Sequence, residues 1–236
     1  YGGRDRPMSL TKKQKIISEK LNSEQTYSVE EALQIIQSVK SEKFDESVDI
    51  SVKLGVDPNK SDQNVRGAVT LPNSLGKEII VAVFADGDHV SDAEAAGADF
   101  IGMDDLADKF QKDEIKVDVV ISTNSAMKVV GKLGQVLGPK GLMPNPKIGT
   151  VSDDVSSAIK NVKAGQVRFR TDKNGIIHGS IGKVSFNGDQ IKANAFALIE
   201  ELKKLKPASA KGVFIGNIAL SSSMGPGVKI NPGELV

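Results

Sequence analysis

The chain has 236 residues, of which 39% are hydrophobic and 26% charged, and this composition is typical of a globular protein rather than a disordered one. Cysteine and tryptophan are absent, which excludes disulfides and thiolate metal sites. The formal net charge is +1, and no apolar run approaches the roughly 18 residues of a membrane span, so no membrane partner is expected.

Charge is distributed unevenly along the chain. Residues 71–118 hold 4 Lys and 12 Asp or Glu, whereas residues 119–150 hold 4 Lys and no acid. Residues 151–236 hold 12 Lys or Arg and 7 Asp or Glu. This segregation indicates a polyanionic partner for the later segments and an acidic block that stays away from it.

The first elements predict one helix and one half-buried strand. Residues 26–40 have an apolar helical face, and Ser28 with Glu31 three residues later matches a capping box. Residues 47–56 alternate strictly between polar and apolar positions, as in a strand with one polar face. Turn residues fill 57–64, and residues 65–72 are predicted as the return strand.

From about residue 74 the pattern changes to continuous apolar strands that alternate with helices. The predicted strands are 78–85, 98–102 and 116–123, and the predicted helices are 90–98, 104–111 and 124–138. Such alternation predicts a parallel sheet covered on both faces. A further helix over 152–165 has Ser152 as its expected N-cap and Gly165 as its stop.

Polar–apolar alternation then returns. Residues 165–172 place Arg168 and Arg170 on one side of a strand, and Asn174-Gly175 is a strong hairpin signal before a partner strand at 175–186. An amphipathic helix is predicted over 189–206 and a last strand over 212–223.

These elements predict an α+β split two-layer domain interrupted by an inserted α/β three-layer Rossmann-like domain. The expected bounds are 1–73 with 165–236 for the discontinuous domain and 74–164 for the insert. Both crossings must enter the insert from one edge, so they should lie close together and act as a hinge.

Catalysis finds little support in the sequence. Neither histidine, His89 or His178, has a serine or cysteine partner in a recognisable motif, and the phosphate-binding patterns GxxxxGK[ST] and GxGxxG are missing. We therefore expect no catalytic residue, no metal site and no cofactor. The rival interpretation is an enzyme or small-ligand protein that uses the α/β unit.

A shaped loop covers residues 137–149, LGPKGLMPNPKIG. It contains three Gly, three Pro and two Lys without an acid. Proline restricts φ and glycine permits positive φ, so the loop should be rigid. Two interpretations remain open: a rigid connection with solvated lysines, or a positively charged loop near phosphates.

The discontinuous domain offers the better candidate site. Arginines can form bidentate bonds to phosphate, hydroxyls and a bare glycine admit a ribose, and Phe and Met can pack on bases. This set suits structured RNA better than a small metabolite, although a solvated sheet face is the common alternative. The candidate RNA-binding residues are Lys43, Phe44, Ser47, Lys53, Arg168, Arg170, Asp172, Asn217, Ser221, Ser223, Met224 and Gly225.

Three separated segments, 41–72, LGPKGLMPNPKIGTV and SSSMGPGVKINP, closely resemble the ribosomal protein L-one family of the large-subunit stalk, in its bacterial type. The resemblance implies a split RNA-binding domain with a Rossmann-like insert. Family RNA contacts carried over by this resemblance fall on Phe44, Ser47, Arg170, Asp172, Asn217, Ser223, Met224 and Gly225. The family often has threonine where this chain has Ser47 and Ser223, which keeps the hydroxyl.

The resemblance also implies partners. These are a stem-and-junction region of large-subunit ribosomal RNA, exit-site transfer RNA whose release it assists, and its own messenger RNA, which it represses. A monomer is expected away from the ribosome, and the ribosome would be that of the bacterial cytoplasm or of an organelle. Asp172 is expected to accept hydrogen bonds from RNA or to hold Arg170. A third interpretation is a pure assembly scaffold.

Overall fold

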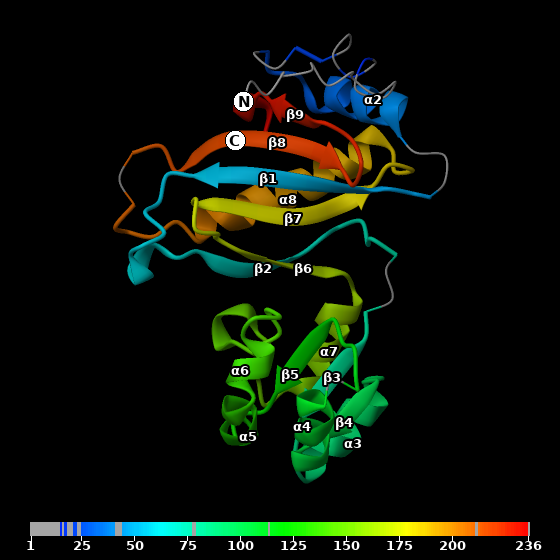
Figure 1. Cartoon of the computed structure of the whole chain (residues 1–236), viewed down its shortest axis with the longest axis vertical. Coiled ribbons are helices and arrows are strands. Elements are labelled where there is room, and N and C mark those ends of the chain that lie inside the picture. The colour runs from blue at the N-terminus through cyan, green and yellow to red at the C-terminus, as the bar shows by residue number, and fades with distance from the viewer. Residues whose placement is uncertain are drawn as a thin grey trace, which may run out of the picture.

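The computed structural model describes residues 15, 17, 21–22, 25–40, 44–76, 79–112, 114–210 and 212–235, with the backbone alone at 61, 88 and 147. Within these ranges, no helix is both long and apolar enough to cross a membrane. The chain is of mixed α/β class with several sheets, as the sequence predicts (Figure 1). Short 3-10 helices complete the described part at Ser61–Gln63, Pro146–Ile148 and Pro232–Glu234.

In the described part of the chain, the largest sheet is four-stranded and antiparallel. Its strand order is β7-β1-β8-β9, formed by β1 (Ser47–Leu54), β7 (Ile176–Lys183), β8 (Ile215–Ser222) and β9 (Gly227–Ile230). Strand β9 was not predicted, because the glycines and proline before it indicate a turn and only four residues follow that alternate. Residues 223–226 form the tight connection from β8 to β9.

Alternation along β1 decides which face of this sheet is buried. Its apolar residues Val48, Ile50 and Val52 are fully buried and pack with the helices α2 (Val29–Val39) and α8 (Gly188–Lys204) in one core. The predicted capping box is confirmed: the Glu31 amide donates to Ser28 Oγ at 3.1 Å, and Glu31 Oε2 accepts from the Ser28 amide at 3.0 Å. The polar residues of β1 therefore point away from the helices, to the face that looks toward the viewer in Figure 1.

A separate two-stranded sheet joins β2 (Arg66–Thr70) to β6 (Gln166–Arg170). The prediction that residues 65–72 return along the first strand is therefore wrong. The hairpin signal at Asn174-Gly175 does mark a turn, with Gly175 at φ +76°, but β6 and β7 form no ladder in the described residues, and the pairing beside the turn is the isolated Thr171–Ile177 bridge. Both strands pair with earlier segments instead, because β2 and β1 offer longer hydrogen-bonded registers.

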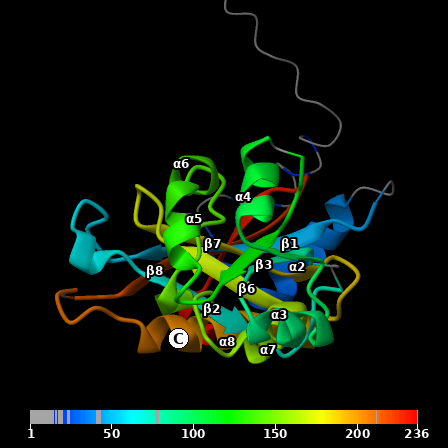
Figure 2. The same cartoon turned by 90° about the horizontal axis from the view of Figure 1, so that it is seen from below.

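The third sheet is parallel, in the order β4-β3-β5, from β3 (Val81–Phe84), β4 (Phe100–Gly102) and β5 (Val119–Ser122). Every residue of β3 and β5 is buried, as predicted for a sheet covered on both faces. One face packs on α4 (Asp104–Gln111), α5 (Met127–Lys132) and α6 (Gly134–Leu137), and the other on α3 (Asp88–Ala95) and α7 (Val155–Lys163). Figure 2 shows these helices on opposite sides of β3.

Two local predictions in this region are wrong. The helix expected over 124–138 is broken at Leu133 into α5 and α6, next to two glycines that weaken helical propensity. Ser152 does not cap α7; the side chain of Asp154 does, accepting from the Ser157 amide at 3.1 Å. A carboxylate is the better acceptor there because it also interacts with the helix dipole.

The two crossings between the antiparallel and parallel regions lie side by side. A Cβ added to Gly165 would meet Ser74 Oγ at 3.2 Å, and Gly165 has φ +92°, so glycine is required there. Just before the first crossing, Asn73 is held by buried Asn194 of α8: its amide donates to Asn194 Oδ1 at 3.0 Å, and Asn194 Nδ2 donates to its carbonyl at 3.0 Å. The predicted proximity of the crossings is confirmed.

Candidate nucleic-acid interface

The four-stranded sheet presents a polar face opposite to its helices, which we call the free face. The register places Asp49 of β1 opposite Ser180 and Ser221, and Ser51 opposite His178 and Ala219. The face thus carries hydroxyls, a histidine and isolated charges. From β1, β7, β8 and β9 its outward residues are Ser47, Asp49, Ser51, Lys53, Ile176, His178, Ser180, Lys183, Asn217, Ala219, Ser221 and Lys229.

One end of the free face gathers five of the predicted site residues, which we call the tip cluster: Phe44, Ser47, Ser223, Met224 and Gly225. The Ser223 amide donates to the Ser47 carbonyl at 3.1 Å, and the Ser47 amide donates to Ser223 Oγ at 3.2 Å. Segments 176 residues apart in sequence are thereby joined. Phe44 is 51% exposed and Met224 63% exposed, so both large apolar side chains are available to a partner.

A buried carboxylate accepts a hydrogen bond from the backbone of the tip cluster. Glu46 is 1% exposed, and its Oε2 accepts a hydrogen bond from the Met224 amide at 3.3 Å. Gly225 follows, and a Cβ there would lie 2.3 Å from Ser222 Oγ. The glycine therefore has a packing reason of its own, in addition to any partner that approaches its backbone.

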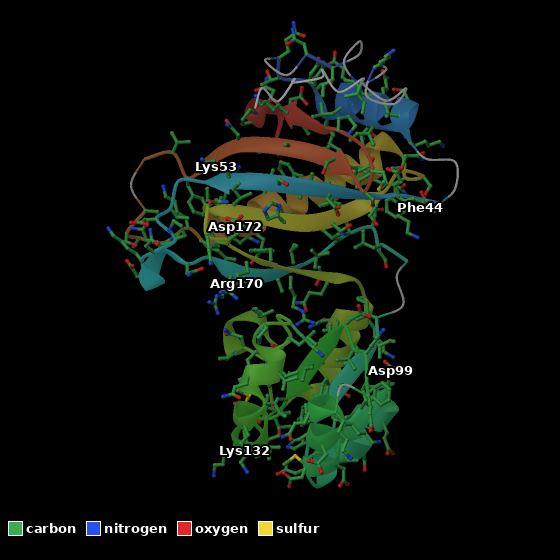
Figure 3. The ribbon with its side chains drawn as sticks, viewed as in Figure 1. Phe44, Lys53, Asp99, Lys132, Arg170 and Asp172 are labelled. Atoms are coloured by element: carbon green, nitrogen blue, oxygen red, sulfur yellow. The ribbon has the colours of Figure 1, made fainter. Side chains whose placement is uncertain are left out.

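The other end of the free face holds Lys53 and Asp172, as Figure 3 shows. Ser47 and Lys53 are six residues apart on β1, so the predicted residues span about 20 Å. Asn217, on β8, is exposed, and Ser221 is half-buried two residues before Ser223 of the tip cluster. The site is therefore an elongated surface rather than a pocket.

Asp172 shapes the turn between β6 and β7. Its Oδ1 accepts from the amides of Ile176 and Asn174, each at 2.8 Å, and its Oδ2 lies 3.5 Å from Nε2 of His178. The Ile176 amide, followed by the Asn174 amide and His178, lowers the pKa of Asp172 below its ordinary value. Its carboxylate is thus committed to its own turn, and its predicted hold on Arg170 remains a prediction.

His178 is a residue of this face that sequence reasoning did not include in the site. It is exposed, and its Nδ1 lies 3.2 Å from Ser51 Oγ on the neighbouring strand. The alternation of residues 176–183 was the signal that could have placed it there, since its position faces away from buried Ile177.

The two predicted arginines do not share the free face. Both lie on β6 in the two-stranded sheet, where Arg170 pairs with Arg66 and Arg168 with Ala68. Arg170 is exposed and Arg168 is half-buried, with one buried terminal nitrogen, so Arg168 is the less accessible of the two; their role in binding RNA stays a prediction. Lys43 lies outside the described residues.

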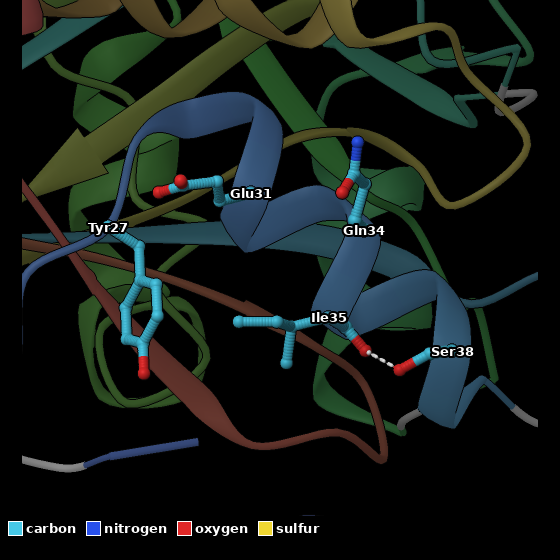
Figure 4. A pocket seen from close by; sticks show the side chains of 5 residues that line it. All are labelled: Tyr27, Glu31, Gln34, Ile35 and Ser38. Carbon is cyan, nitrogen blue, oxygen red and sulfur yellow. Dashed lines mark hydrogen bonds between the residues drawn. The ribbon is translucent and has the colours of Figure 1, made fainter. Parts of the chain in front are cut away.

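Other places for chemistry are few in the described residues. They contain no group of three or more histidine, aspartate or glutamate side chains that could hold a metal ion. A hollow on the outer side of α2 is lined by Tyr27, Glu31, Gln34, Ile35 and Ser38 (Figure 4). Ser38 donates to the Ile35 carbonyl of its own helix at 2.7 Å, and this pairing leaves no converging set of polar groups in the hollow.

Comparison with known proteins assigns the class. Residues 36–226 match the model of the Ribosomal protein L1p/L10e family, and the chain belongs to this family. It is 55% identical over 226 residues to the large ribosomal subunit protein uL1 of Saccharophagus degradans, covering 96% of this chain and 98% of that protein. The protein of the same name from Alcanivorax borkumensis is 56% identical, with 96% and 98% covered, and that of Coxiella burnetii strain RSA 331 is 54% identical, with 94% and 96% covered.

Proposed function

We propose that this chain is a structural component of the large ribosomal subunit that binds large-subunit ribosomal RNA through the free face and the tip cluster. The observation that carries the proposal is the pair of exposed apolar side chains, Phe44 and Met224, held at the end of a polar, uncovered sheet face. Such side chains stack on bases, while the hydroxyls of the face suit ribose and phosphate oxygens. The relatives named as large-subunit proteins support the same assignment.

Recognition would depend on shape and hydrogen bonds more than on charge. The free face carries Lys53, Lys183 and Lys229 but also Asp49, and Asp172 lies beside it. Few phosphate contacts predict a shallow salt dependence, since log affinity falls by about 0.9 per neutralised phosphate for each decade of salt. A steep slope, as in nonspecific basic proteins, contradicts this mechanism.

The chain would act as two domains. We propose the bounds 1–73 with 165–236 for the RNA-binding domain and 74–164 for an insert. The separate hydrophobic cores support this division, because the first is built from both chain ends and the other two only from the middle. The adjacent crossings at Ser74 and Gly165 would form the hinge.

Family resemblance supports three finer roles. The protein would assist the release of deacylated transfer RNA from the exit site, repress translation of its own messenger RNA, and reside in the ribosome of the bacterial cytoplasm or of an organelle. Ribosomes that lack the protein should release exit-site transfer RNA more slowly. Normal release would favour the alternative of a pure assembly scaffold.

The direct test is binding of the full chain to a transcribed large-subunit RNA fragment, with a scrambled transcript of equal length as reference. Phe44→Ala should weaken binding by about 1–3 kcal/mol, the cost of one lost base stack. The matched control is Phe196→Ala, which removes an equally exposed ring from α8, on the opposite side of the sheet.

Met224→Ala should act like Phe44→Ala and leave the unfolding temperature unchanged, because its side chain is 63% exposed. If Phe44→Ala and Met224→Ala both bind the fragment normally, the proposed site is wrong. If the fragment and the scrambled transcript bind equally, the proposed function is wrong.

A further inference from the structure

A cleft of roughly 400 Å³ lies between the two-stranded sheet and the shaped loop at 137–149. Three arginines, Arg66, Arg168 and Arg170, line it from β2 and β6, and Gly138, Gly141 and Asn145 line it from the loop. The loop contributes no charged side chain to the lining, so the charge of the cleft comes from the three arginines of the sheet. Arginines that lie close together repel one another unless an anion lies between them.

Arg168 is the least satisfied charged group in this cleft. One of its terminal nitrogens is buried and has no hydrogen-bond partner among the described residues. Burial lowers the pKa of Arg168, and the nearby Asp118 carboxylate partly offsets the shift. The Asp118 carboxylate also accepts from the Ile80 amide at 3.3 Å. Arginine keeps its charge in proteins, so this buried donor requires an acceptor.

We propose that this cleft binds a phosphate group carried by a nucleotide. The planar guanidinium presents paired donors that match phosphate oxygens, and the volume exceeds that of inorganic phosphate and admits a nucleotide unit. Gly141 has φ +70°, and a Cβ there would meet no atom within 4 Å, so the loop backbone leaves open space on its side. The phosphate would neutralise the three arginines of the sheet and accept the unpaired donor of Arg168.

This inference does not rest on the proposed function, because the cleft is formed by β2, β6 and the loop rather than by the free face. The phosphate could belong to a free nucleotide or to the backbone of RNA. These two sources share their chemistry at Arg168, and separate binding measurements distinguish them.

The experiment is calorimetric titration of the full chain with inorganic phosphate and with adenosine monophosphate at constant ionic strength. Arg168→Met should weaken binding about tenfold, the loss of one charge-assisted hydrogen bond. Arg168→Lys keeps the charge but loses the planar fork and should fall between Arg168→Met and the unchanged chain. The matched control, Lys192→Met, removes one exposed positive charge from α8, outside both the cleft and the free face, and should change binding less than about twofold.

In a second arm, the same variants are titrated with the large-subunit RNA fragment over a range of salt. If the RNA backbone is the source, Arg168→Met should reduce the salt slope by about 0.9, and the free anions should bind only weakly. If Arg168→Met unfolds, Arg66→Met replaces it. The inference is overturned if neither ligand responds to the arginine variants, or if Lys192→Met has the same effect. Failure of the unchanged chain to bind RNA contradicts the proposed function alone.

Discussion

The two large sheets of this molecule differ in how many of their faces are covered. The parallel sheet has helices on both faces, and β3 and β5 are buried at every residue. The antiparallel sheet has α2 and α8 on one face, and β1 alternates between buried and accessible residues. The parallel sheet contributes buried residues to the core, whereas the antiparallel sheet leaves a large polar surface uncovered. The comparison teaches that an uncovered sheet face, more than net charge, indicates where a nearly neutral protein binds.

The largest expected effect is a loss of stability in the parallel sheet, which is covered on both faces. Phe84 is fully buried and stacks on Phe110, with ring centroids 5.8 Å apart. Phe84→Ala should destabilise the parallel region by about 3–5 kcal/mol, because it removes a core ring and leaves a cavity. Denaturant unfolding measures this loss. RNA affinity should be unchanged under conditions where the antiparallel region stays folded, and a parallel loss of affinity would contradict the separation of roles.

A smaller effect is expected at the joint between the two regions. Asn194 is fully buried, and its Nδ2 donates to the Ile181 carbonyl at 2.7 Å as well as to Asn73. Asn194→Leu should cost about 2–3 kcal/mol, because the Asn73 amide and two carbonyls lose their partners. Hydrogen exchange should report faster exchange at the Asn73 amide. An unchanged rate there would show that the joint does not depend on Asn194.

A double variant can test the contact between Gly225 of the tip cluster and Ser222. Gly225→Ala should destabilise the protein by about 1–2 kcal/mol through crowding of Ser222 Oγ. Ser222→Ala should be nearly neutral, since that hydroxyl is buried without a partner among the described residues. The double variant should recover most of the loss, because the next atom, Ser222 Cβ, is 3.5 Å away. Additive effects in thermal unfolding would show that Gly225 is required for another reason.

The smallest expected effect is the contribution of Asp172 to the pH dependence of stability. The native pKa of Asp172 is lowered by amide hydrogen bonds, so its contribution to stability is present above its ordinary pKa and is lost as the pH falls through the lowered value. Asp172→Asn should therefore be less stable than the unchanged chain at pH 6, and the difference should begin to shrink below about pH 4 and vanish only below the lowered native pKa. Unfolding at several pH values measures this. Equal RNA binding by Asp172→Asn would show that its charge has no role in recognition.

Periodicity predicted more of the fold than turn chemistry did. Alternation at 47–54 and continuous apolar runs at 81–84 and 119–122 correctly separated the half-covered sheet from the covered one. Strand pairing was less predictable, because Asn174-Gly175 fixes a local turn but not the registers available to β6 from β2. Such long-range competition leaves no local mark in the sequence.

In the candidate site too, local motifs were predictable from the sequence and long-range packing was not. Motif resemblance placed Phe44, Ser47, Ser223, Met224 and Gly225 in one site, and the structure brings four of them together through β1 and the β8–β9 turn, with Phe44 three residues before Ser47. The burial of Arg168 could not be predicted, because the loop at 137–149, which lines the same cleft, ends well before β6 in the chain and leaves no local pattern beside Arg168.

The attachment of Asn73 to α8 has a mechanical consequence. The chain is anchored by hydrogen bonds at Asn73, and the second crossing passes so close to Ser74 that a Cβ at Gly165 would lie 3.2 Å from its Oγ. The two connections at Ser74 and Gly165 lie next to each other, and the first begins directly after the anchored Asn73. This arrangement permits the parallel region to rotate relative to the antiparallel region but restricts translation between them. We expect the parallel region to rotate as a rigid body about the two connections, so that the residues farthest from them move the greatest distance.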